Sequence, residues 1–137
     1  MENSKKAYLI IGCCILLVAA FSAVILYRAF LFEKKTYEQI DMEQAAEYME
    51  YEEDYLIIDV RPETDYLDGH LPGAVNLPLE QLEEKAILLL KDKEQMIYVY
   101  GGSGKESRKA ARWLGNRDYI NITEIGDFRN WKGTVEK

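Results

Sequence analysis

The sequence predicts an α/β domain, with helices on both faces of a parallel sheet, preceded by one transmembrane helix. Short apolar runs alternate with helical patterns along residues 37–132, which is typical of parallel strands joined by helical crossovers. Two of these runs, 55–58 and 96–100, are apolar throughout, as expected for strands covered on both faces. The third observation is a stretch near the amino terminus, 7–27, that contains no charged residue.

The uncharged stretch is long enough to cross a bilayer. At about 1.5 Å per residue, a helix of this length spans about 30 Å, the thickness of the hydrocarbon core. We therefore expect an amino-terminal tail at 1–6, a transmembrane helix at 7–32 and a polar connector at 33–36. The connector is short and has no Gly/Ser- or Pro-rich linker, so the domain should lie close to the membrane.

Three other interpretations of this stretch remain open. A buried core helix would normally be shorter and carry a polar stripe. A cleaved signal peptide needs a small-residue site after its apolar core, but apolar residues continue past Ala20-Phe21-Ser22. A lipoprotein signal at Cys13 would have only about six apolar residues before it, fewer than such signals use. An uncleaved single-pass anchor fits best.

The flanking charges bear on which side the domain faces. Two lysines lie before the stretch, and Arg28, Lys34 and Lys35 follow it, so the positive-inside count is nearly even. A very short tail that carries two lysines is typical of an anchor whose amino terminus stays inside. We therefore expect the domain outside the cytoplasm.

Charge and cysteine content restrict the function of the rest of the chain. Residues 33–137 contain 23 acidic and 14 basic residues, and this excess predicts that nucleic acid is not a partner, because phosphates would be repelled. Cys13 and Cys14 are the only cysteines, and both lie in the apolar stretch. The domain itself has no thiol and no cysteine metal site, and we expect no cofactor and no bound metal.

The first half of the domain begins with a short strand at 37–40. Asp41, with Gln44 three positions later, is a capping box that predicts a helix over 42–50. A polar turn leads to the strand at 55–58. The chain leaves this strand through 59–62, and Pro62 ends its pairing.

The second half opens with a segment dense in turn residues, 68–73. A strand is predicted at 74–77, an amphipathic helix at 79–90 and a buried strand at 96–100. A glycine-rich loop at 101–104 leads to a helix at 107–117, with Ala110, Ala111 and Leu114 facing inward. A last strand at 119–122 and a helical turn at 128–131 complete the domain.

Ligand sites of parallel sheets lie at the carboxyl ends of the strands. Here that edge carries Asp59 and Arg61 after one strand and the segment 101–106 after another. We expect these groups to form the site.

Three segments carry a resemblance to a known family. Asp59-Val60-Arg61-Pro62, Gly69-His70-Leu71-Pro72-Gly73-Ala74 and Gly126-Asp127-Phe128-Arg129-Asn130-Trp131 together resemble the rhodanese superfamily. The likeness covers 37–132 and leaves a carboxy-terminal tail at 133–137. It implies a five-stranded parallel sheet and sulfurtransferase ancestry, with an Asp59–Arg61 ion pair and a turn at His70 as structural supports of the site.

The sequence departs from the family at the active loop. The family usually has Tyr-Cys, then x-x-Gly-x-Arg-Ser, where this chain has Tyr100-Gly101-Gly102-Ser103-Gly104-Lys105-Glu106-Ser107. Gly104 and Ser107 match the pattern, but Gly101 stands in place of the cysteine and Glu106 in place of the arginine. Persulfide chemistry requires a thiolate, so the resemblance implies that sulfur transfer is lost.

Three other kinds of chemistry are alternatives at the loop. Ser103 with His70 as base would be an alternative nucleophile, and His70 with Asp65 or Asp68 a metal site, but the position of His70 favours a turn residue. A phosphate-binding loop fails because Val99 stands where its first glycine belongs and Glu106 where Ser or Thr is needed.

The loop can still offer backbone N–H groups to an anion. The anion-binding candidates are Gly101, Gly102, Ser103, Gly104, Lys105, Glu106 and Ser107. We expect the Glu106 carboxylate to occupy these donors itself, so that external anions bind weakly; alternatively, the glycines only permit a tight turn.

These observations favour a membrane-anchored, catalytically inactive domain that acts as a binding or regulatory module, with an unknown protein partner. One alternative is an enzyme of the same family that works by an unrecognised route. Another is a structural domain that scaffolds a partner through its acidic surface.

Overall fold

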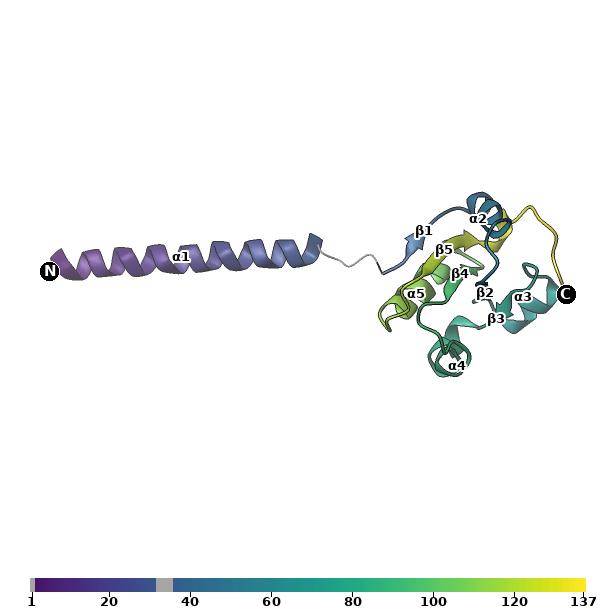
Figure 1. Cartoon of the computed structure of the whole chain (residues 1–137). Helices are drawn as coiled ribbons and strands as arrows, with labels where there is room; N and C mark the ends of the chain where they lie inside the picture. Colours follow the sequence, from purple (N-terminus) through teal and green to yellow (C-terminus); the bar gives the residue numbers. More distant parts are fainter. Residues whose placement is uncertain (1, 32–35) are drawn as a thin grey trace. The chain divides into compact units, whose positions relative to one another are not determined.

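The computed structural model describes residues 2–31 and 36–137. The chain divides into two compact units, 1–34 and 35–137. The first unit is helix α1, Glu2–Leu31 (Figure 1). Within it Ile10–Arg28 is long and apolar enough to cross a membrane, and none of its residues is buried. The helix begins before residue 7, where the transmembrane helix was predicted, and residues 32–35, which include most of the predicted connector, lie outside the described part.

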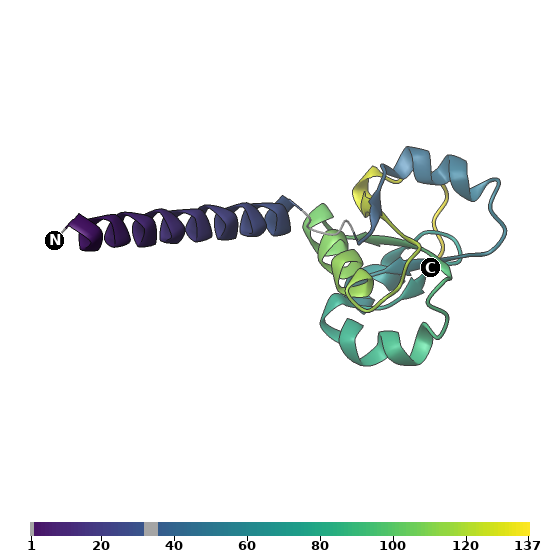
Figure 2. The same cartoon turned by 60° about the vertical axis from the view of Figure 1, so that its left-hand side comes forward.

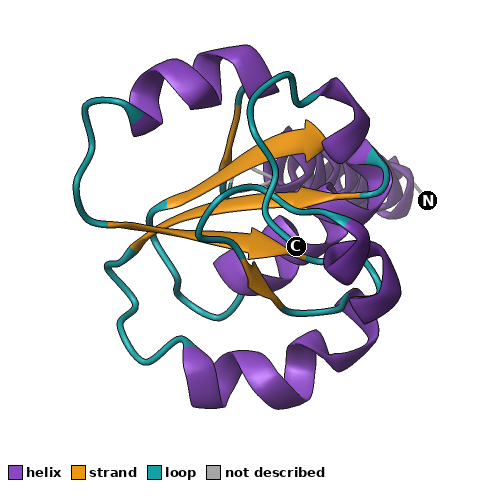
Figure 3. Cartoon of the chain, turned by 90° about the vertical axis from the view of Figure 1, so that its right-hand side faces the viewer, coloured by secondary structure: helices purple, strands orange, loops and turns teal. Residues whose placement is uncertain are grey.

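The second unit is built on a single sheet. Its strands are β1 (Glu38–Gln39), β2 (Tyr55–Asp59), β3 (Val75–Asn76), β4 (Met96–Gly101) and β5 (Ile122–Asp127). They lie in the order β1-β5-β4-β2-β3, and every neighbouring pair is parallel (Figure 3). The predicted five-stranded parallel sheet is confirmed.

Helices cover both faces of this sheet (Figure 2). They are α2 (Met42–Met49), α3 (Glu63–Asp68), α4 (Leu82–Leu89) and α5 (Gly104–Gly115), with 3-10 turns η1 (Leu79–Gln81) and η2 (Phe128–Asn130). One core joins α4 and α5 to the sheet, and a second joins α2 to its other face. The capping box at Asp41 and Gln44 is present, and Ala110, Ala111 and Leu114 are buried as predicted.

Several predicted boundaries are wrong. The last strand begins at Ile122 instead of 119, because Tyr119 is buried in the first core and its hydroxyl donates to the Leu90 carbonyl at 2.6 Å. Helix α5 begins at Gly104 instead of 107, because Ser103 is its N-cap. The segment 79–90 divides into η1 and α4. Helix α3 was not predicted at all, because its six residues bury no apolar side chain and show no apolar period.

The last residues, predicted as a separate tail at 133–137, are attached to the domain. The backbones of His70 and Glu136 exchange two hydrogen bonds, of 3.0 and 2.9 Å. The Trp131 indole N–H donates to the Thr134 carbonyl at 2.8 Å. The segment therefore continues the fold as far as Glu136.

Candidate functional site

The loop after β4 lies at the carboxyl end of the sheet, as predicted. Strand β4 ends at Gly101 and α5 begins at Gly104, so two residues make the turn. Ser103 caps the helix: its hydroxyl accepts the Glu106 N–H at 3.4 Å, and its carbonyl accepts the N–H groups of Glu106 and Ser107 at 3.1 and 3.2 Å. A serine at the N-cap satisfies donors that the first helical turn leaves without partners.

The carboxylate of Glu106 folds back over this turn. Its Oε2 accepts the Gly102 N–H at 3.0 Å, in the first turn of α5, where the helix dipole favours negative charge. Nearby, the Lys105 side chain is exposed and that of Ser107 is buried, and the Arg108 guanidinium lies close to Gly104. The Gly102 N–H, which could otherwise donate to an anion, therefore donates to the Glu106 carboxylate.

Gly101 is surrounded closely. A Cβ atom at this position would lie 3.2 Å from the Glu106 Cβ and 3.3 Å from both the Ser103 carbonyl oxygen and the Ser107 amide nitrogen. At these distances the neighbours would have to move by a few tenths of an ångström. A side chain at 101 would thus project directly beside Glu106.

Asp59 and Arg61 form the predicted ion pair beneath the loop. Arg61 donates to both Asp59 oxygens, with Nη2 at 2.6 Å from Oδ2, and also to the Gly69 carbonyl at 2.7 Å. The pair is buried, and the guanidinium lies 3.7 Å from the centre of the Phe128 ring. Burial lowers the pKa of Arg61, but the hydrogen bond and charge of Asp59 outweigh it, so the pKa is raised.

His70 belongs to the turn after α3. Its Nδ1 lies 2.9 Å from the Tyr66 carbonyl and its ring stacks on that of Tyr66 at 3.7 Å. A carbonyl only accepts, so Nδ1 carries a hydrogen. In the described residues no hydrogen bond joins His70 to Ser103, which caps α5 instead. This geometry gives no support to a Ser103–His70 nucleophile and fits the predicted turn role.

Sequence reasoning missed a buried carboxylate under the loop. Glu124 lies in β5 and is fully buried; its Oε1 accepts the Ser107 hydroxyl, and its Oε2 has no hydrogen-bond partner. The residue lies in the run Ile122-Thr123-Glu124-Ile125, and a glutamate in a short strand with isoleucines on both sides is a signal that could have been used. The contact ties the first turn of α5 to the sheet.

Comparison with known proteins assigns this architecture to a family. The family model described as "Rhodanese-like domain" matches residues 40–134. The chain belongs to the rhodanese-like family. The rhodanese-like domain therefore accounts for nearly all of the second unit.

Its relatives include proteins of sulfur metabolism. The thiosulfate sulfurtransferase PspE of Escherichia coli is 30% identical over 73 residues, which are 53% of this chain and 70% of that protein. The putative sulfur carrier protein YrkF of Bacillus subtilis is 33% identical over 101 residues, 72% of this chain. The chain spans only about half, 52%, of the length of YrkF.

Solved structures agree with the fold. The solution structure of the rhodanese-like domain of the Anabaena sp. Alr3790 protein is 31% identical, with a TM-score of 0.66 over 72% of this chain and 77% of that one. An Escherichia coli rhodanese with anions is 28% identical, with a TM-score of 0.57 over 61% of this chain and 98% of that one. This rhodanese-like domain is thus related to sulfurtransferases and sulfur carriers in sequence and in fold.

Proposed function

We propose that this rhodanese-like domain is held at a membrane and acts as a binding or regulatory module without transferring sulfur. The observation that carries the proposal is the loop of 101–107: Gly101 occupies the expected cysteine position, and no thiol exists anywhere in 36–137. Glycine offers no atom on which a persulfide can form. The Glu106 carboxylate beside it adds negative charge where a thiolate would need a positive partner.

The test is a thiosulfate:cyanide sulfurtransferase assay on the full chain in detergent. The expected result is no turnover above a boiled sample of the same protein. Turnover clearly above that control overturns the proposal and favours a family enzyme with an unrecognised nucleophile. In that case Ser103→Ala tests the only hydroxyl in the turn itself.

The same loop should bind small anions weakly, since its own carboxylate is tethered and loses little entropy on binding. Sulfate titrated into the isotope-labelled full chain in micelles should shift the amide signals of the loop only after Glu106→Gln. Lys105→Gln, which also neutralises one charge of the loop, serves as the matched control. Saturable shifts at micromolar sulfate in the unmodified protein would contradict the self-occupied loop.

The membrane tether is supported by α1, whose segment Ile10–Arg28 has the length and composition of a span. We propose that the chain crosses once and that the domain lies outside the cytoplasm, where an unidentified protein partner binds it. A topology reporter fused to the carboxyl terminus tests the side. Activity of a reporter that works only in the cytoplasm would reverse the assignment.

A further inference from the structure

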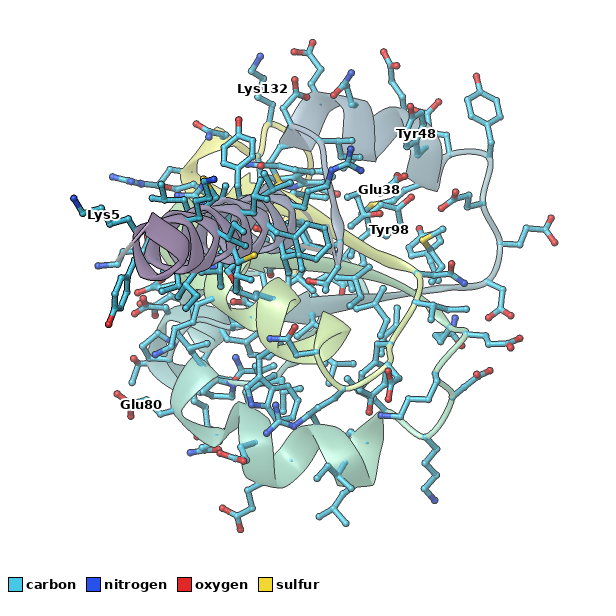
Figure 4. The ribbon with its side chains drawn as sticks, turned by 90° about the vertical axis from the view of Figure 1, so that its left-hand side faces the viewer. Lys5, Glu38, Tyr48, Glu80, Tyr98 and Lys132 are labelled. Atoms are coloured by element: carbon cyan, nitrogen blue, oxygen red, sulfur yellow. The ribbon has the colours of Figure 1, made fainter. Side chains whose placement is uncertain are left out.

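The domain has an exposed apolar surface on α4, apart from the loop of 101–107. Three successive residues of α4, Ile87, Leu88 and Leu89, are exposed, and so is Ile120 after α5; their exposed fractions run from 54 to 69%. Figure 4 shows α4 along one edge of the second unit, with side chains projecting from it away from the sheet. Three consecutive exposed apolar residues are unusual on a soluble surface unless they contact something. We call these four residues the α4 patch.

The two parts of the α4 patch are connected. The Ile120 N–H donates to the Lys93 carbonyl at 3.0 Å, and the Tyr119 hydroxyl reaches the carbonyl of Leu90, the residue after α4. The Lys93 ammonium lies 3.5 Å from the centre of the Tyr119 ring. The segment that follows α4 and the segment that follows α5 therefore lie side by side.

Charged residues of both signs surround the α4 patch. Residues 36–137 contain 22 acidic and 12 basic residues. The segment 85–93 has three exposed lysines, Lys85, Lys91 and Lys93, and one acidic residue, Asp92, and the exposed glutamates Glu83, Glu84 and Glu94 border it. Lysines that flank apolar residues can place their methylene stems beside them and their charges in a polar headgroup layer.

The position of the α4 patch in the fold indicates what it contacts. Strands β4 and β5 begin at Met96 and Ile122, so the segments before them lie at the amino ends of the strands. Thr36, two residues before β1, packs at the same end: a Cβ on Gly115, the last residue of α5, would lie 2.4 Å from it. The chain that comes from α1 thus joins the domain at the end that carries Leu89 and Ile120.

The chain length makes a bilayer the nearest large surface, provided that α1 is the membrane anchor proposed above. Thr36 is eight positions after Arg28, the last residue of the apolar segment. Eight Cα-to-Cα steps cover at most about 28 Å even in a fully extended chain. A tether of this length gives the domain a high effective concentration at the lipid surface, so a small apolar patch is sufficient for binding.

We propose that the α4 patch is a lipid-contacting surface, which rests on the headgroup layer of the membrane that holds α1. The apolar side chains insert beside the headgroups, and the lysine stems lie along the same layer. The loop of 101–107, at the opposite ends of the strands, then faces the aqueous phase and is open to a partner.

The experiment uses the full chain with Cys13→Ser and Cys14→Ser, reconstituted singly in lipid nanodiscs of phosphatidylcholine with or without phosphatidylglycerol. A fluorescent label is attached through Leu88→Cys, through Ile120→Cys, or through the control Leu67→Cys. Leu67 is similarly exposed, at 58%, but lies in α3, which follows the carboxyl end of β2. Quenching by lipids that carry a spin label near the headgroup is then measured.

Labels at 88 and 120 should be quenched at least about threefold more than the label at 67, because interfacial side chains reach about 5–10 Å into the boundary layer. Equal quenching at all three positions would overturn the proposal. Protection of position 88 only in discs that hold two copies would also overturn it, in favour of a contact between copies. Failure of the chain to co-float with liposomes would instead refute the anchor itself, so the two proposals fail separately.

Discussion

A cysteine introduced at Gly101 should report the charge that Glu106 places in the loop. The comparison is between Gly101→Cys and Gly101→Cys with Glu106→Gln, both in a background of Cys13→Ser and Cys14→Ser. Both variants have the same position at the start of α5, so the effect of the helix dipole on the thiol is common to the two. The difference in thiol pKa then measures the glutamate alone.

Coulomb's law gives the expected size of this difference. A Cβ at 101 lies 3.2 Å from the Glu106 Cβ, so the added sulfur is close to the carboxylate, and a separation of about 5 Å is taken for the Coulomb energy. Two like charges at about 5 Å repel by about 3 kcal/mol at an effective dielectric constant of about 20, which corresponds to about 2 pKa units. Glu106→Gln should lower the thiol pKa by about this amount, and Glu106→Arg should lower it further.

The assay is the rate of alkylation of the thiol as a function of pH. A complete pH profile is needed, because a thiolate of lower pKa is also a weaker nucleophile and a rate at a single pH would understate the shift. Glu94→Gln, which removes the same charge before β4, at the other end of the strand, is the control and should leave the thiol pKa unchanged. Circular dichroism checks that the tightly enclosed position tolerates the cysteine. If the thiol pKa is the same in Gly101→Cys and in Gly101→Cys with Glu106→Gln, the electrostatic reasoning about this loop is wrong.

Two further predictions concern the stability of the domain, followed by the fluorescence of its tryptophans in urea. Asp59→Asn should lower the free energy of unfolding by about 3–5 kcal/mol, because it leaves the Arg61 guanidinium buried without its counter-charge. The control is Asp127→Asn, which alters a pair with the same hydrogen bonds but an exposed arginine and should barely move the urea midpoint. Equal losses of stability in the two variants would refute this. Burial raises the pKa of Tyr98 and Tyr100, and nearby carboxylates raise it further. The neutral phenols therefore contribute their full stability below the unfolded pKa of about 10, and this contribution is lost as the pH rises above it. A midpoint that does not fall above about pH 10 would contradict this.

Local signals in the sequence were sufficient for much of the fold. The alternation of apolar runs and helical patterns predicts the parallel sheet, and the capping box at Asp41 places the start of α2, because both depend on residues a few positions apart. The boundary of β5 could not be read in this way. Tyr119 looks like a strand residue, but its burial against Leu90 keeps it out of the sheet.

The features of the site also separate into those set by local sequence and those set by contacts between distant residues. By itself the sequence determined that the loop has no thiol, that it lies at the carboxyl edge of the sheet, and that Asp59 and Arg61 lie near it, since residue types and parallel strand order are sufficient for that. Only the tertiary structure decided that Glu124 holds the Ser107 hydroxyl and that the final segment pairs with His70, because these contacts join residues that are far apart in the chain. Such contacts exist only after the sheet has brought its strands into register, and no local pattern records them.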